Sequence, residues 1–220
     1  MKILVRPRAA SPANRLDIGR TTIAIKARPL RVLDFDCEAR PLHWISGDFV
    51  SKEITAIAWK WIGDASKPVA MLLGEVDPRE MLRAFVEQYT QADLVVGHYI
   101  RGYDLPMVSG ALTEYQMAPL GKKMTQDTKI DLLRRQGLSS SQENLGAMLG
   151  LKNPKVKMDQ ASWRAANRLQ PEGLKAVRER VIGDVLQHIE LRQRLLELGY
   201  LGPPKLWDSN SAEPLATYTP

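Results

Sequence analysis

The sequence contains one cysteine, three phenylalanines and no long hydrophobic run. A single cysteine, Cys37, excludes a disulfide within the chain and is typical of a reducing compartment such as the cytoplasm. The longest apolar run, 69–73, has the length of a strand and is far shorter than a membrane span. Residues 1–8 contain no apolar core typical of a secretory signal. We therefore expect a cytoplasmic protein with no membrane association.

Basic residues are concentrated near the start of the chain. Residues 1–31 contain eight Lys or Arg and one Asp, whereas the whole chain carries a net charge of +6, so the remainder is close to neutral. This composition predicts a basic N-terminal arm over 1–30, which either follows nucleic-acid phosphates or is simply a solvated terminus. The rest has the length of one domain over 31–200, followed by a C-terminal tail over 201–220.

The pattern of apolar residues predicts an α/β protein. Strands are expected at 31–36, 54–62, 69–73 and 92–97. Helices are expected at 78–91, 104–117, 139–150 and 171–198. A loop is expected at 40–48 and a short element at 128–135, and the polar segment 151–169 has no clear assignment. A strand meander followed by alternating helices and strands indicates a mixed sheet with helices on both sides.

Two acidic side chains stand at the end of the first expected strand. Residues two apart in a strand point to the same face, so Asp36 and Glu38 should lie side by side while Cys37 turns into the core. Two partly desolvated carboxylates repel each other unless a cation neutralises them. Hard carboxylate oxygens suit Mg²⁺ or Mn²⁺, so this pair predicts a divalent metal site.

Two further acids stand out by their surroundings. Asp104 follows the expected strand at 92–97 after a short turn, where sites are built in α/β sheets, and the alternative is that it only caps the next helix. Asp184 lies inside the long apolar-periodic helix, next to Gly183, where an acid is unfavourable. Such a carboxylate needs a partner, which is either a metal ion or a basic side chain.

Taken together, the segments around Asp36 and Glu38, Asp104 and Asp184 resemble the motifs of the DEDD superfamily of 3′–5′ exonucleases. Their order and separation match, and the resemblance covers about residues 31–198. The segments 125–128 and 141–145 also resemble the fifth strand of these enzymes and the helix that follows it. The resemblance implies a ribonuclease H-like fold with a mixed five-stranded sheet flanked by helices. The three matching motifs are Asp36-Cys37-Glu38, Gly97-His-Tyr-Ile-Arg-Gly-Tyr-Asp-Leu-Pro106 and Ile182-Gly-Asp184-Val.

The resemblance points to the proofreading-type exonucleases encoded by phages and bacteria. It implies hydrolysis of phosphodiester bonds with two Mg²⁺ or Mn²⁺ ions held by Asp36, Glu38, Asp104 and Asp184. It favours DNA as the nucleic acid, with a polymerase or another replication protein as a partner, in the cytoplasm of a bacterial or phage-infected cell. The alternatives are an RNA exonuclease, a structure-specific endonuclease on the same fold, or a catalytically weakened nucleic-acid-binding subunit.

The third motif departs from the family pattern. These enzymes usually carry a Tyr four residues, or a His five residues, before the last Asp, and that side chain readies the attacking water. Here those positions are Arg180 and Glu179, and Arg180 is placed to pair with Asp184 one turn away. His188 shares that helix face and is either a substitute base or a histidine of the core or surface.

The second motif departs as well, because Tyr99 replaces the usual Asn before Ile. Trp44, in the expected loop after the first strand, either stacks on a base or anchors the core. The lysines of later loops either follow a nucleic-acid strand or are solvated surface residues: Lys122, Lys123, Lys152, Lys155 and Lys157. The side chains expected to contact substrate or support the site are His98, Tyr99, Arg101, Tyr103, Arg180, His188 and Trp44.

Overall fold

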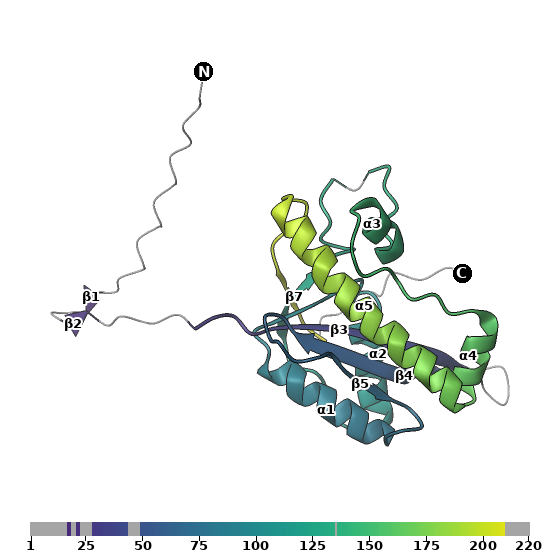
Figure 1. The fold of residues 1–220 in the computed structure, drawn as a ribbon. Coiled ribbons are helices and arrows are strands. Elements are labelled where there is room, and N and C mark those ends of the chain that lie inside the picture. Colours follow the sequence, from purple (N-terminus) through teal and green to yellow (C-terminus); the bar gives the residue numbers. More distant parts are fainter. Residues whose placement is uncertain (1–16, 19–20, 23–27, 44–48, 135, 210–220) are drawn as a thin grey trace.

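The computed structural model describes residues 17–18, 21–22, 28–43, 49–134 and 136–209. Its centre is a six-stranded mixed sheet (Figure 1) in which the strand order is β5-β4-β3-β6-β7-β8. The first three of these run antiparallel, β3, β6 and β7 run parallel, and β8 returns antiparallel. A separate two-residue pair joins β1 (Asp17–Ile18) and β2 (Thr21–Thr22). The sheet strands are β3 (Val32–His43), β4 (Phe49–Trp61), β5 (Val69–Leu72), β6 (Leu94–Gly97), β7 (Lys123–Asp127) and β8 (Lys205–Trp207).

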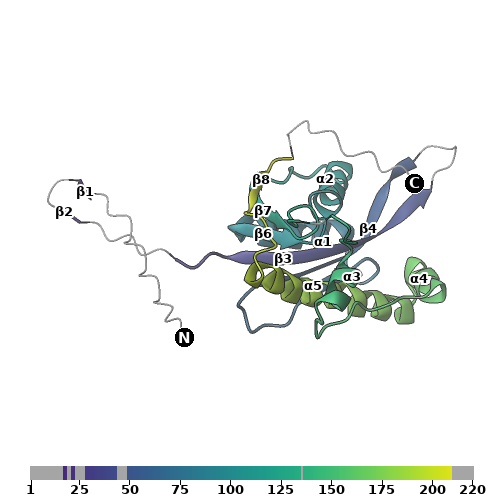
Figure 2. The ribbon, with the colours of Figure 1, turned by 90° about the horizontal axis from the view of Figure 1, so that it is seen from above.

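Helices cover both faces of the sheet. Side chains of α1 (Pro78–Gln91) and α2 (Asp104–Glu114) pack into one apolar core against β3 and β4. On the opposite face, α5 (Pro171–Glu197) crosses β3, β4 and β5, accompanied by α3 (Gln142–Met148) and α4 (Gln160–Asn167). Seen from above, α5 and α4 lie on one side of the sheet and α2 on the other (Figure 2). The expected class, a mixed sheet flanked by helices, is therefore confirmed.

The alternation along β3 decides which side chains reach each face. Leu33, Phe35 and Cys37 point into the core beneath α1 and α2, and the rings of Phe35 and Phe85 lie 4.7 Å apart. The alternate residues of β3 consequently point toward α5, and the β4 positions that pair with Asp36 and Glu38 carry the small side chains of Ala58 and Ala56. Those alanines leave room for acidic side chains between the sheet and the helix.

The long helix is anchored by valines spaced four residues apart. Val177, Val181 and Val185 are each at most 2% exposed and pack on the sheet, as the sequence predicts. Within the described part of the chain, none of the helices is long and apolar enough to span a membrane.

The expected loop at 40–48 is wrong where the structure describes it. β3 continues to His43 and β4 already begins at Phe49, so the two strands form a longer ribbon than the sequence indicated. Pro41 suggested a loop because it cannot donate to a ladder. However, β6 pairs only with Val32–Asp34, so this end of β3 has one neighbour and tolerates the missing N–H.

Two further elements differ from expectation. The segment after Pro203-Pro204 was assigned to the C-terminal tail, but Lys205–Trp207 forms β8 on the open edge of β7, which makes six strands instead of five. The unassigned segment 151–169 contains α4, whose N-cap Asp159 accepts a hydrogen bond from the Ser162 N–H at 2.7 Å. Most of the predicted basic arm and residues 210–220 lie outside the described residues, so the predicted domain limits stay predictions.

Candidate metal centre

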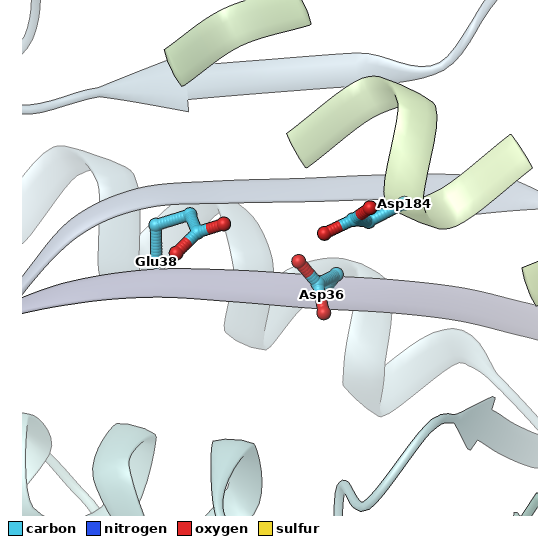
Figure 3. A group of neighbouring side chains, drawn as sticks. All are labelled: Asp36, Glu38 and Asp184. Carbon is cyan, nitrogen blue, oxygen red and sulfur yellow. The ribbon is translucent and has the colours of Figure 1, made fainter. Parts of the chain in front are cut away.

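Three carboxylates from two elements converge between the sheet and α5. One carboxylate oxygen from each of Asp36, Glu38 and Asp184 can be chosen so that all three lie within 4.8 Å of one another. Asp36 and Glu38 rise from the same face of β3, and Asp184 comes down from α5 toward them (Figure 3). A β-bulge follows Glu38, so the regular ladder is interrupted immediately beside the cluster.

Gly183 explains how a loop reaches the helix at this point. A Cβ atom on Gly183 would lie 3.0 Å from Cγ2 of Val156, so the glycine leaves room for the loop at 151–159 to lie against α5. This loop brings the ammonium of Lys155 to 3.2 Å from Asp184 Oδ2. The sequence had offered Lys155 only as one of several loop lysines, because its approach depends on this packing.

Arg180 provides the second positive charge in the cluster. Its Nε donates to Glu38 Oε1 at 2.5 Å, and its Nη2 lies 3.7 Å from Asp184 Oδ2. The expected proximity of Arg180 to Asp184 is therefore present, but the hydrogen bond is made to Glu38.

Burial makes the ionised state of these carboxylates unfavourable. It raises the pKa of Asp36 well above its usual value, and the negative charges of Asp104 and Asp184 add to the effect. Burial also raises the pKa of Glu38 despite the opposing charge of Arg180, and that of Asp184 despite Lys155. Arg180 and Lys155 therefore neutralise the negative charge of the three carboxylates only in part.

One carboxylate oxygen has no partner. Asp184 is 3% exposed, and its Oδ1 is buried without a hydrogen bond to any of the described residues. A buried acceptor that is left unsatisfied is costly, and a bound cation removes that cost. Hard oxygen donors, incomplete charge compensation and an unpartnered buried oxygen together fit a divalent cation such as Mg²⁺ or Mn²⁺.

Asp104 lies next to this group without belonging to it. It is 2% exposed at the start of α2, and its Oδ1 accepts the Cys37 N–H at 3.0 Å. The N-cap of α2 is Tyr103, so the alternative in which Asp104 merely caps its helix is wrong. Burial raises the pKa of Asp104 to about 7, although the Cys37 N–H acts in the opposite direction. The carboxylate is thus tied to the strand that carries Asp36 and Glu38.

His188 lies in the protein interior beside the site. It is 2% exposed, its Nδ1 lies 2.5 Å from Asp34 Oδ2, and its Nε2 lies 2.9 Å from Thr128 Oγ1. Both ring nitrogens are occupied, which fits a histidine of the core rather than a substitute base. Asp34 was not singled out from the sequence, although the same alternation that pairs Asp36 with Glu38 places it on this face.

His98 continues this polar chain. Its Nδ1 lies 2.9 Å from Thr128 Oγ1, so Thr128 joins the rings of His98 and His188. Its Nε2 is buried without a hydrogen-bond partner among the described residues. Burial, reinforced by the nearby charges, lowers the pKa of His98 to about 3, so the ring is neutral at neutral pH.

The turn that carries Tyr99 and Arg101 is held by backbone contacts. Asp127 accepts the N–H groups of Tyr99 and Arg101 at 2.9 and 3.0 Å, and Tyr99 has a positive φ of 69°. Arg101 donates to the buried carboxylate of Asp131 at 2.6 Å. These two residues therefore shape the turn that delivers Asp104.

Of the remaining candidates, Tyr103 is near the carboxylates and Trp44 is not described. Burial raises the pKa of the Tyr103 hydroxyl, and Asp104 and Glu38 add to that effect, which places the phenol in the field of the cluster. Trp44 falls outside the described residues.

Comparison with solved structures supports the fold. The chain is similar to the family B DNA polymerase from the hyperthermophilic archaeon Pyrobaculum calidifontis, with a TM-score of 0.57 and 17% sequence identity. The match covers 80% of this chain but only 26% of the polymerase chain. At this identity the likeness establishes the fold alone, and that fold is consistent with a ribonuclease H-like sheet. No protein-family model matches the sequence, and no curated protein matches it either.

Proposed function

We propose that this protein is a metal-dependent 3′–5′ exonuclease that hydrolyses phosphodiester bonds of DNA, with residues 31–200 forming the catalytic domain. The observation that carries the proposal is the convergence of Asp36, Glu38 and Asp184, together with the buried Oδ1 of Asp184, which has no hydrogen-bond partner among the described residues. The order of the three sequence motifs and the mixed sheet support it.

Asp36, Glu38, Asp184 and Asp104 would hold two Mg²⁺ or Mn²⁺ ions. Such ions, when bound, supply charge stabilisation for the phosphodiester and lower the pKa of a water nucleophile. The protein contributes carboxylates that β3 and α5 hold in place before any substrate binds. Their partly buried environment strengthens electrostatic interactions.

The usual base is absent from this arrangement. Arg180 occupies the position where related enzymes carry Tyr, and a guanidinium does not accept a proton at neutral pH. His188 has both ring nitrogens engaged. We infer that removal of the water proton depends on the metal ions and on the carboxylates.

Two observations favour DNA as the substrate. The structural neighbour is a DNA polymerase, which favours DNA over RNA and a polymerase or another replication protein as the partner. The basic segment 1–31 adds positive charge that suits a phosphate backbone.

The test is a cleavage assay with 5′-labelled single-stranded DNA, duplex DNA and RNA, each in Mg²⁺, Mn²⁺ or EDTA. We expect a metal-dependent ladder that shortens DNA from its 3′ end and disappears in Asp36→Asn. The matched control is Asp64→Asn, since Asp64 lies in the exposed turn between β4 and β5, outside the three motifs, and accepts a local Ser66 N–H.

Other outcomes separate the alternatives. Internal cuts would indicate an endonuclease, and preferential shortening of RNA an RNA exonuclease. Binding of nucleic acid without cleavage in either metal would contradict the enzymatic proposal and support a binding subunit.

A further inference from the structure

Arg180 is held on three sides, which is unusual for a long basic side chain at a site surface. Its Nε donates to Glu38 Oε1 at 2.5 Å and its Nη1 donates to the Val156 carbonyl at 2.8 Å. Its guanidinium also lies 5.3 Å from the centre of the Trp163 ring, within range of a cation–π interaction. The side chain is 17% exposed. The guanidinium therefore has a fixed position and orientation before any ligand binds.

The third nitrogen of Arg180, Nη2, is the one nearest Asp184. Nη2 lies 3.7 Å from Asp184 Oδ2, beyond hydrogen-bond distance, and makes no hydrogen bond to the described residues. The fixed fork thus retains N–H donors beside the cluster. Burial acts to lower the pKa of Arg180, but Glu38 and Asp184 outweigh it and raise the pKa, so the group remains a cation.

Lys155 offers a useful contrast. Among the described residues its ammonium has one ion pair, with Asp184, and its side chain is 25% exposed. A single contact on a flexible stem allows the ammonium to move when another cation approaches, whereas Arg180 would have to give up Glu38, Val156 and Trp163 together. Arg180 is therefore the cation that stays in place.

We propose that Arg180 is a phosphate-binding residue of this site, which uses its free Nη2 donors to hold a non-bridging oxygen of the phosphate that is bound beside Asp184. This inference rests on the proposed function and deepens it, because it assigns a role to the residue that replaces the usual base. Arg180 supplies positive charge to the phosphate and takes no proton from the water. A planar guanidinium with two anchored nitrogens is suited to this task, since its remaining donors point in one direction.

The test measures phosphate binding without turnover. Thymidine 5′-monophosphate is titrated into the protein in Ca²⁺ by calorimetry, for wild type, Arg180→Gln, Arg180→Lys and Arg194→Gln. Arg194 lies on the same helix, is half-exposed and pairs with nearby Glu197, so it is a matched control. Loss of a charge-assisted hydrogen bond is expected to weaken nucleotide binding about 10- to 100-fold in Arg180→Gln. Arg180→Lys should lose less, and Arg194→Gln should match wild type.

A second titration, with Mn²⁺ alone, separates phosphate binding from support of Glu38. If Arg180 binds phosphate, Arg180→Gln keeps or gains Mn²⁺ affinity, because a positive charge has left the cluster. Equal nucleotide binding by wild type and Arg180→Gln, absence of nucleotide binding by wild type, or loss of Mn²⁺ binding in Arg180→Gln would each overturn the inference. Thermal melting of each variant checks that it is folded.

Cleavage assays distinguish this inference from the proposed function. If wild type and Arg180→Gln shorten DNA at the same rate, the exonuclease function stands and the proposed role of Arg180 is wrong. If wild type binds the nucleotide through Arg180 but cleaves neither DNA nor RNA, the phosphate site stands and the exonuclease function is wrong.

Discussion

The ammonium nitrogen of Lys155 lies 3.2 Å from Oδ2 of Asp184, and the other oxygen of that carboxylate has no hydrogen-bond partner in the part of the chain that the structure describes. The protein thus places one of its own positive charges beside Asp184, one of the three clustered acids. A divalent ion bound by Asp184 would share that carboxylate with the ammonium and be repelled by it. The affinity of the site for metal therefore depends on a residue outside the three motifs.

Replacement of Lys155 by Gln should strengthen metal binding. Removal of the positive charge takes away repulsion at close range, and we expect the Kd for Mn²⁺ to fall by about 3- to 10-fold, or about 1 kcal/mol. Calorimetric titration with Mn²⁺ measures the change. Lys157→Gln is the control, because Lys157 is 83% exposed and pairs with Glu143. Weaker Mn²⁺ binding in Lys155→Gln would show that the lysine supports the site.

Asp36→Asn should stabilise the protein when no metal is present. Burial and three neighbouring carboxylates raise the pKa of Asp36 well above its unfolded value, so its ionisation at neutral pH opposes folding. The amide has nearly the same shape and no charge. We expect a melting temperature in EDTA higher by about 2–4 °C, which corresponds to about 1 kcal/mol for a chain of this size.

The same variant should lose the stabilisation that metal provides. Binding to the native state alone raises the melting temperature of wild type as Mn²⁺ is added, and this response should be much smaller in Asp36→Asn. A variant that melts lower than wild type in EDTA, or responds equally to Mn²⁺, would contradict a crowded metal site at Asp36.

The residues predicted from sequence are those whose positions follow from local geometry. Strand alternation alone places Asp36 and Glu38 together and turns Cys37 into the core. Helical periodicity places Asp184 on the buried face of α5. These inferences hold because the period of an element is a property of a few neighbouring residues.

The rest depends on packing between distant segments. The contact of Lys155 with Asp184 requires the loop at 151–159 to lie on α5, and no pattern in the loop specifies that approach. Likewise, β8 forms because β7 has an open edge, which its own short sequence does not reveal. The cap at Asp159 was a readable local signal for α4, but it lay in a segment that is polar over most of its length.

Gly173→Ala should destabilise the protein by disturbing the contact of α4 with α5. A Cβ atom at Gly173 would lie 2.1 Å from the backbone nitrogen of Ala166, so the two helices would have to move apart. We expect a loss of about 2–4 kcal/mol in the free energy of unfolding, measured by urea denaturation. The control is Gly110→Ala within α2, where nothing lies within 4 Å and alanine should add about 0.5–1 kcal/mol. Equal stabilities of the two variants would contradict the close helix contact.

His98 should make the protein less stable as the pH falls below about 6.5. Burial, together with the charges of His188, Lys129 and Lys155, lowers the pKa of the folded ring to about 3. The unfolded chain takes up a proton near pH 6.5, so between these two values the unfolded state binds more protons and stability falls with falling pH.

Urea denaturation of wild type and His98→Gln over pH 5 to 7.5 isolates this contribution. The free energy of unfolding of wild type should fall about 2 kcal/mol further than that of His98→Gln on going from pH 7.5 to pH 5. The carboxyl groups with raised pKa values, such as Asp34 and Asp36, act with the opposite sign, since the folded state holds their protons more tightly. Their effect is common to both proteins and cancels in the difference. Parallel curves would contradict the lowered pKa of the buried His98 ring.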